Sequence, residues 1–254
     1  MQNPQVSRVE ALICRLEHDY WNEHEQFKLL LEAICAAKEK LLNLKALFIG
    51  DWGEHQFRKS KIDVLGIRKL LEAYPNLEVL QVRGRFSEYS LECGGLRHKN
   101  LKTLIIETAD LNNYNLTEIG IIDLPKLEYL EIWLGRQAGV ENLGFILTHD
   151  SFPNLKYLGL KSGEQTDKIA QAIINAPVLK HLSVLDLSMG TLTDNGVEAL
   201  LNCPEIEQLH TLDISYNAVS EGAIAYLSEL SCNLIADNQA GDPYYGHRYS
   251  ALYE

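Results

Sequence analysis

The sequence lacks the features that mark several classes of protein. No apolar run approaches the roughly 18 residues of a membrane span, and no basic segment followed by an apolar block opens the chain, so no secretory signal is expected. Basic residues are few, because 23 lysines and arginines stand against 35 acidic residues and leave a net charge of −12. A chain this acidic repels phosphate backbones, so nucleic acid is not an expected partner.

Cysteine is scarce, and known catalytic motifs are missing. The five cysteines are odd in number and include no Cys-x-x-Cys pair, which favours reduced thiols and a cytoplasmic location over a disulfide framework. Glycine motifs for nucleotides, the Gly-x-Ser-x-Gly elbow and the zinc motif His-Glu-x-x-His do not occur. The sequence therefore predicts a non-enzymatic protein with neither cofactor nor metal.

One pattern recurs along the chain, Leu-x-x-Leu-x-apolar. Its seven copies start at Leu44, Leu77, Leu101, Leu127, Leu155, Leu182 and Leu209. Successive copies follow one another at a nearly even spacing. Such a spacing indicates a repeat architecture, in which each copy is a short strand.

The segments between the last copies repeat as well. Thr166-Asp167, Thr193-Asp194 and Ser220-Glu221 recur at one constant interval, and each reads as a helix cap followed by an acid. Pro177 and Pro204 are expected to end two of the helices. Each unit is thus a strand, a turn, a helix of about three turns and a return loop, and parallel strands joined in this way coil to the right.

This pattern resembles the leucine-rich repeat proteins of the ribonuclease-inhibitor-like subclass over residues 41–235. The resemblance implies an α/β fold, a right-handed solenoid with a parallel concave sheet and helices on the convex side. The asparagine that usually follows the strand is present only as Asn217. The equivalent positions hold Trp52, Arg85, Ala109, Gly135, Gly163 and Gly190. There, water or other groups must supply the hydrogen bonds that the asparagine would make to the backbone.

A narrower resemblance rests on several longer segments. They are RLEHDY (15–20), LKALFIGDWGE (44–54), LLEAYPNLEVLQVRG (70–84), LEIWLG (130–135), LDLSMGTLTDNGVEALL (185–201) and the ending HRYSALYE (247–254). These resemble a bacterial family of leucine-rich repeat proteins. That family has no assigned biochemical activity, so the resemblance implies a bacterial source and little about function.

We expect a single domain over residues 1–254, with an atypical repeat or cap at 1–40, about seven repeats at 41–235 and an aromatic tail at 236–254. Residues 9–17 fit a helix or a strand. We favour a strand in which Cys14 corresponds to Leu47, followed by a helix over about 23–40. Residues 51–63 are expected to form a polar surface loop. The tail tyrosines either cover the end of the array or lie across the concave face.

Three groupings could carry chemistry, and each has a plainer interpretation. The cluster of His18, Asp19, Glu23, His24 and Glu25 places no two histidines one helical turn apart, so a solvated acidic helix start is favoured over a metal site. Cys203 is better explained by core packing than as a nucleophile. Asp186 and Asp213 lie at equivalent positions of adjacent strands, but a catalytic pair would need a pocket and a partner base.

The outward positions of the predicted strands single out one surface. In Leu-x-x-Leu-x-Leu the third, fifth and seventh residues point away from the core. Three aromatic side chains and four carboxylates gather there on or near the middle strands: Tyr129, Trp133, Tyr157, Glu107, Glu131, Asp186 and Asp213.

Exposed aromatics beside carboxylates are typical of a binding hot spot for a protein with a basic surface. A bland sheet surface is the plainer alternative, since tyrosine and tryptophan suit strands in any case. The alternative function is an accessory protein that binds a small molecule or peptide for an enzyme encoded elsewhere.

Overall fold

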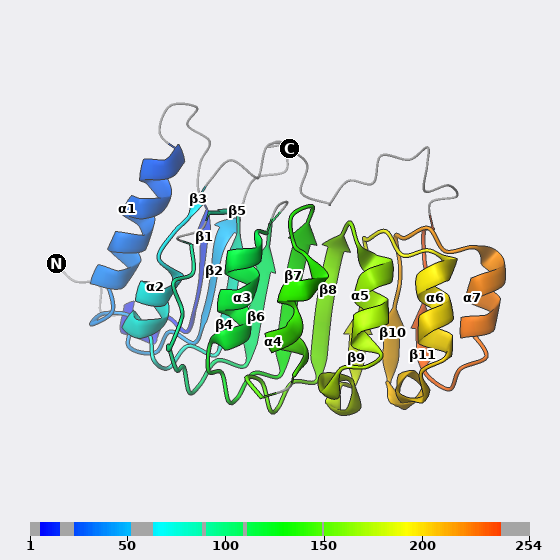
Figure 1. The fold of residues 1–254 in the computed structure, drawn as a ribbon. Helices are drawn as coiled ribbons and strands as arrows, with labels where there is room; N and C mark the ends of the chain where they lie inside the picture. The colour runs from blue at the N-terminus through cyan, green and yellow to red at the C-terminus, as the bar shows by residue number, and fades with distance from the viewer. Residues whose placement is uncertain are drawn as a thin grey trace.

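The computed structural model shows a row of parallel strands with helices along one side (Figure 1). The structure describes residues 6–15, 23–51, 63–87, 90–108, 111–148 and 150–239. The predicted tail tyrosines and residues 52–62 of the predicted polar loop lie outside these ranges.

The strands lie in the order in which they occur along the chain. Within the described ranges, nine strands form one parallel sheet, and β3 and β5 form a small second one. The strands of the large sheet are β1 (Ala11–Arg15), β2 (Ala46–Asp51), β4 (Val79–Arg83), β6 (Thr103–Glu107), β7 (Tyr129–Gly135), β8 (Tyr157–Gly163), β9 (Val184–Asp186), β10 (Thr211–Asp213) and β11 (Asn233–Ile235); the small sheet pairs β3 (Asp63–Val64) with β5 (Arg85–Phe86). Sequential parallel strands joined through helices coil to the right.

The helices cover one face of the large sheet and leave the other open (Figure 1). The α-helices are α1 (Glu23–Ala36), α2 (Ile67–Ala73), α3 (Asn113–Ile121), α4 (Gly144–Leu147), α5 (Thr166–Ile173), α6 (Asp194–Leu201) and α7 (Glu221–Leu227); the 3-10 helices are η1 (Val6–Arg8), η3 (Val140–Asn142), η4 (Pro177–His181) and η5 (Pro204–Gln208). A helix is about 10 Å wide and a strand about 4.8 Å, so the sheet takes the inner, concave side. The fold is the predicted leucine-rich repeat solenoid.

The repeated leucines form the core between sheet and helices. Leu77 and Leu80, the first and fourth residues of one copy, are fully buried, as are Leu155 and Leu158 of another. Burying each such side chain contributes roughly 1.5–3 kcal/mol. No single repeat can enclose its own leucines, so the stacking of neighbours stabilises the array.

Two of the predicted turns show which groups hydrogen-bond the buried backbone when the asparagine is present and when it is absent. The fully buried Asn217 accepts a hydrogen bond from Leu192 N at 2.8 Å and donates to the carbonyls of Leu187 and Ile214 at 2.9 Å. Two repeats earlier its place is taken by Gly163. There the buried Thr166 hydroxyl donates to the carbonyl oxygen of Gly163 at 2.8 Å and accepts from the backbone nitrogen of Thr191 at 2.9 Å. The expectation that another group replaces the asparagine is confirmed at this turn.

The helices and prolines differ in detail from the sequence prediction. Helices α5 and α6 have eight residues each, about two turns rather than three. Thr193 and Ser220 cap their helices as expected, but Thr166 is the first residue of α5 and its hydroxyl points to the turn instead. The predicted helix over 23–40 ends at Ala36.

Pro177 and Pro204 do not end α-helices. Each is the first residue of a 3-10 helix, η4 and η5 respectively. That position suits proline, because its fixed φ matches a helix start and the N–H it lacks would have had no partner there.

At the N-terminal end, the strand interpretation of residues 9–17 is confirmed over Ala11–Arg15, with one correction; residues 16 and 17 lie outside the described residues. Strand β1 pairs Leu12 with Leu47 and Cys14 with Ile49, so the predicted match of Cys14 with Leu47 is wrong by two residues. A shift of two keeps the same side chains inward. Cys14 is therefore buried as expected, and Ile13 faces outward with 66% of its surface exposed.

Candidate functional site

The sheet register places the predicted outward residues in straight rows across the strands. Tyr129 of β7 lies beside Tyr157 of β8, and Trp133 lies beside Lys161. Between these two pairs, Glu131 faces Gly159. A β-carbon at position 159 would approach the Tyr157 ring to 3.0 Å and Glu131 Cγ to 3.3 Å. The glycine therefore leaves room for the Tyr157 ring and the Glu131 side chain to lie over β8.

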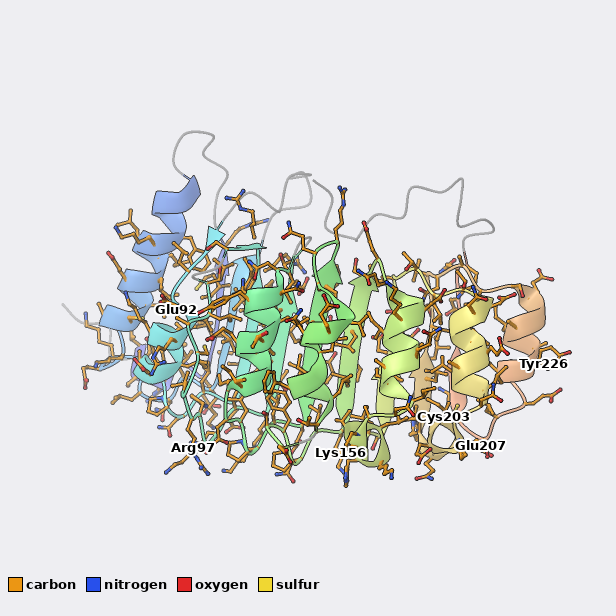
Figure 2. The ribbon with its side chains drawn as sticks, in the orientation of Figure 1. Glu92, Arg97, Lys156, Cys203, Glu207 and Tyr226 are labelled. Carbon is orange, nitrogen blue, oxygen red and sulfur yellow. The ribbon has the colours of Figure 1, made fainter. Side chains whose placement is uncertain are left out.

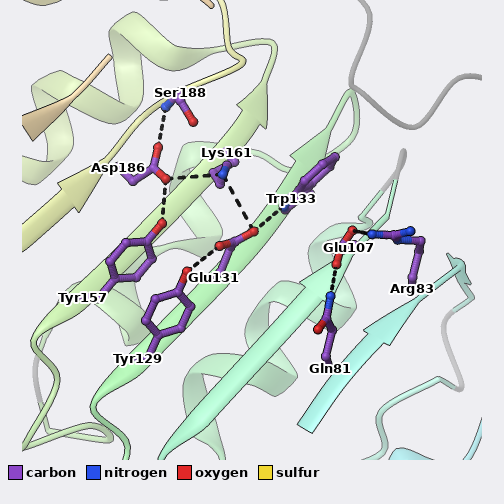
Figure 3. A network of polar contacts seen from close by, with 10 residues as sticks. All are labelled: Gln81, Arg83, Glu107, Tyr129, Glu131, Trp133, Tyr157, Lys161, Asp186 and Ser188. Carbon is purple, nitrogen blue, oxygen red and sulfur yellow. Dashed lines mark hydrogen bonds and ion pairs between the residues drawn. The ribbon is translucent and has the colours of Figure 1, made fainter. Parts of the chain in front are cut away.

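Two buried carboxylates hold the aromatic side chains in place (Figure 3). Glu131 accepts hydrogen bonds from the Tyr129 hydroxyl and from Trp133 Nε1, both at 2.7 Å. Asp186 of β9 accepts from the Tyr157 hydroxyl at 2.6 Å. Its second oxygen accepts from the backbone nitrogen of Ser188 at 2.9 Å. Such hydrogen bonds to ionised oxygens are the strong ones, so the three rings have fixed orientations.

Lys161 lies between the two carboxylates. Its Nζ is 3.4 Å from Asp186 Oδ2 and 3.9 Å from Glu131 Oε1, and 5.8 Å from the centroid of the Trp133 ring. The lysine side chain is only 17% exposed. It therefore compensates part of the negative charge that two buried carboxylates would otherwise concentrate.

The tyrosines stack on one another. The ring centroids of Tyr129 and Tyr157 are 3.9 Å apart, and the ring planes differ by 7°. Burial raises the pKa of both hydroxyls above the usual value of 10, and the negative charge of Asp186 raises that of Tyr157 further. Both hydroxyls thus stay protonated and act as hydrogen-bond donors over the physiological range.

Glu107 of β6 belongs to a second, separate group. Two guanidinium nitrogens of Arg83 lie 2.7 and 2.6 Å from Glu107 Oε2, and Gln81 Nε2 donates to Oε1. Glu107 is only 3% exposed. The Arg83 guanidinium in turn lies 5.5 Å from the centre of the Phe48 ring. Both carboxylate oxygens of Glu107 are therefore engaged within the chain.

The structure thus divides the seven predicted residues into three sets. Five of them meet in one network: Tyr129, Glu131, Trp133, Tyr157 and Asp186. Glu107 lies in the Arg83 group. Asp213 lies next to Asp186 in the register, and among the described residues its side chain bonds only the backbone nitrogen of Ser215. We expected Glu107, Glu131 and Asp186 to be open counter-charges, whereas their oxygens already have partners within the chain.

Sequence reasoning assigned no role to Lys161, Arg83 or Gln81. A signal was present, because each occupies an outward position on a strand next to one that carries an acid. Opposite charges at neighbouring outward positions of adjacent strands pair readily. What the sequence cannot give is the side-chain geometry that lets Lys161 reach two carboxylates together.

This network presents three half-buried rings, each hydrogen-bonded at its polar atom by a carboxylate. Across the described ranges, no group of three or more His, Cys, Asp and Glu side chains could hold a metal ion. In those same ranges no helix is long and apolar enough to cross a membrane.

Comparisons with known proteins support the fold. No protein-family model matches the chain, and no curated protein matches it. A solved protein from Bacteroides fragilis is similar with a TM-score of 0.83 and 24% identity, over 99% of this chain and 71% of that one. An internalin from Listeria monocytogenes is similar at 14% identity over 82% of this chain and 71% of that one, but its TM-score of 0.35 is too low to carry an argument. The first likeness shows the fold alone.

Proposed function

We propose that the protein is a non-enzymatic interaction module that binds a partner protein on the concave face of its sheet. The observation that carries this proposal is the set of half-buried Tyr129, Tyr157 and Trp133 rings, fixed in place at the middle of an open face by Glu131 and Asp186. Tyrosine and tryptophan are the side chains most often found at the energetic centres of interfaces.

Fixed orientation favours binding by these rings. A side chain that is mobile in the free protein loses conformational freedom when a partner covers it, at about 0.5–1.5 kcal/mol each. The hydrogen bonds of Glu131 and Asp186 have already ordered the three rings. A partner that packs against them gains contact area with little further loss of entropy.

We propose that the partner has a basic surface. The chain carries a net charge of −12. Arg83 neutralises Glu107, and the one positive charge of Lys161 lies beside two carboxylates, Glu131 and Asp186. Asp213 is half-buried and, among the described residues, bonds only to the nearby backbone. A negative field of this kind speeds the approach of a cationic partner and weakens as salt is added.

Several finer assignments belong to the same proposal. The even repeat spacing, with α-helices on the convex side, supports the ribonuclease-inhibitor-like subclass. The continuous core supports one domain. All five cysteines are free thiols, which supports a cytoplasmic location.

A second candidate function rests on a pocket between α1 and α2. Its volume is about 540 Å³, within the range of ligand sites, and Leu31, Cys35 and Lys69 are among its lining residues. An accessory protein that holds a small molecule for an enzyme encoded elsewhere could use this pocket. Such a ligand would raise the melting temperature of the protein, and Leu31→Trp, which fills the pocket, should abolish the rise.

The interaction proposal predicts the effect of removing the central ring. Trp133→Ala should weaken partner binding by about 2 kcal/mol or more, roughly 30-fold in Kd, because truncating a central aromatic removes both contact and ordering. The measurement is affinity capture from a lysate of the source organism, followed by titration of the captured protein by calorimetry at low and high salt.

Tyr226→Ala is the matched control. Tyr226 is 65% exposed on α7, on the helical side of the molecule (Figure 2). The Tyr226→Ala variant should bind the partner as tightly as the wild type does. Equal retention of the same proteins by the wild type, Trp133→Ala and Tyr226→Ala would contradict the concave-face proposal.

A further inference from the structure

The two ends of the concave face differ in chemistry. Half of the outward positions of β1, β2, β4 and β6 are apolar: Ala11, Ile13, Ala46, Phe48, Val79 and Ile105. The polar ones are Arg15, Gln81, Arg83, Thr103 and Glu107. Ile13 is 66% exposed, and the other five apolar residues are exposed or half-buried. The acid at this end, Glu107, is neutralised by Arg83. This half of the face therefore carries more apolar surface than the other half, and no described residue covers Ile13.

At the other end the charged side chains are acids, and two outward residues there, Val184 and Ile235, are apolar. Asp186 of β9 and Asp213 of β10 lie side by side in the register. Asp237, two residues after β11, is exposed, and its backbone nitrogen bonds Ser215 of the neighbouring repeat. Among the described residues, Glu131 and these three acids make four carboxylates at outward positions from β7 onward, against the single ammonium of Lys161. The stacked tyrosines lie at the boundary between the two halves.

From this gradient we infer that the partner presents an α-helix that lies across the strands, with an apolar end over β1–β6 and a basic end over β9–β11. The inference rests on the proposed function and specifies the part of the partner that is bound. A basic end matches Asp213 and Asp237, which pair with no cation among the described residues, and an apolar end covers Ile13. If the partner helix bound in the opposite direction, its basic end would lie over the apolar residues, and the acids would remain unpaired.

Dimensions favour a helix over an extended peptide. Outward residues two positions apart on a strand are about 6.6 Å apart, so a helix 10–12 Å across contacts two rows at once, whereas an extended chain follows one row. The apolar residues of β1–β6 do occupy two rows, with Ile13, Phe48 and Ile105 in one and Ala46 and Val79 in the other. Nine strands at about 4.8 Å span roughly 38 Å, the length of a helix of about 25 residues.

Site-specific photo-crosslinking tests the inference. The photoreactive residue p-benzoylphenylalanine replaces Ile13 at the apolar end, Asn233 of β11 at the acidic end, or Tyr226 of α7 as the convex control. Each full-length variant is irradiated in a lysate of the source organism, and the crosslinked peptides are identified by mass spectrometry. Ile13 and Asn233 should capture the same protein through two peptides of one helix-periodic segment, separated by about the length of a helix that spans the sheet. The Asn233 peptide should be rich in lysine or arginine and the Ile13 peptide in apolar residues.

A charge variant adds a second readout. Asp213→Asn should lower the crosslink yield at Asn233 about threefold at low salt, in the range of one exposed ion pair. Glu198→Gln, which removes an exposed acid from α6 on the helical side, should leave that yield unchanged.

The outcomes separate the two proposals. Capture of one protein at both sites through distant segments, or with the basic peptide at Ile13, would overturn the helix inference and leave the proposed function standing. Crosslinks from Ile13 or Asn233 to residues 240–254 of the same chain would overturn the inference by making the tail the occupant. Capture at Tyr226 alone, or at no site, would overturn both.

Discussion

Asn217 makes four hydrogen bonds from a side chain that is 1% exposed. It accepts from the backbone nitrogen of Leu192 and donates to the carbonyls of Leu187, Ile214 and Ser215. These bonds join two repeats at the end of the concave strands. An apolar side chain at this position would leave several buried backbone groups without partners.

Asn217→Ala should therefore lower the free energy of unfolding by about 3 kcal/mol. Urea denaturation followed by circular dichroism measures the change. Asn175→Ala is the control, because Asn175 is exposed and bonds only within its own helix turn. A loss below about 1 kcal/mol in Asn217→Ala, or equal losses in the two variants, would show that the buried amide is not what joins these repeats.

Thr166 supplies the corresponding bonds where the chain has glycine. A β-carbon at Gly190 would overlap the Thr166 hydroxyl oxygen. Gly190→Ala must therefore displace that hydroxyl and break its bonds to the Gly163 carbonyl oxygen and the Thr191 nitrogen.

We predict a double-mutant cycle with strong coupling at this turn. Gly190→Ala should cost about 2 kcal/mol in the wild type and less than about 1 kcal/mol when Thr166 is already alanine, because the displaced group is then absent. Urea denaturation of the four proteins gives the coupling energy. If the losses of stability in the two single variants simply add in the double variant, the Thr166 hydroxyl does not take over the role that the Asn217 side chain has in its own repeat.

Among the structural elements, β7 and β8 carry the aromatic network, and its stability should depend on pH. Burial and the charge of Asp186 raise the pKa of Tyr157 in the folded state above its unfolded value of about 10. The unfolded chain therefore releases this proton at lower pH than the folded one. The resulting stabilisation is complete below about pH 10 and is lost as the pH rises through the folded-state pKa.

The urea midpoint of the wild type should therefore fall more steeply between pH 10 and pH 11.5 than that of Tyr157→Phe. Tyr74, whose pKa burial raises to about 12, is present in both proteins and adds the same slope to each. Parallel curves for the two proteins above pH 10 would contradict the buried, hydrogen-bonded state of the Tyr157 hydroxyl.

The elements also show what the sequence could and could not predict. The leucine spacing predicts each strand and its inward face, because alternation along a strand is a local property. Contacts between repeats are not local. Asp167 was expected to stabilise the start of its own helix, but its carboxylate accepts hydrogen bonds from Thr193 of the next repeat at 2.7 Å. Asp194 does the same for Ser220. Such pairs depend on how neighbouring helices stack, which the period alone does not specify.

The same limit applies to the candidate site. Reading the outward positions placed Tyr129, Trp133 and Tyr157 together, and the register confirms that Tyr129 and Tyr157 are neighbours. The sequence prediction treated Glu131 and Asp186 as free charges, because a sequence does not show that Lys161 reaches both. Side-chain pairing across strands requires the three-dimensional register and the rotamers.

For the whole molecule, the parallel stacking of repeats makes one continuous concave face from β1 to β11. Each repeat contacts mainly its neighbours. The concave face of the described residues therefore consists of rows of side chains, with one side chain from each strand in a row, and does not form a pocket. Most of its apolar outward residues lie at one end, its unpaired carboxylates among the described residues lie at the other, and the aromatic network lies in the middle. A surface with this gradient suits an elongated partner that is bound in one direction.

Hydroxyl-radical footprinting of the full-length protein, with and without its captured partner, tests the central claim most directly, because it reports the solvent access of individual side chains. If the concave face is the binding surface, oxidation of Trp133 should fall several-fold in the complex, while oxidation of Tyr226 on the helical side stays unchanged. Protection of Tyr226 with Trp133 still fully reactive would place the partner on the convex side and contradict the account.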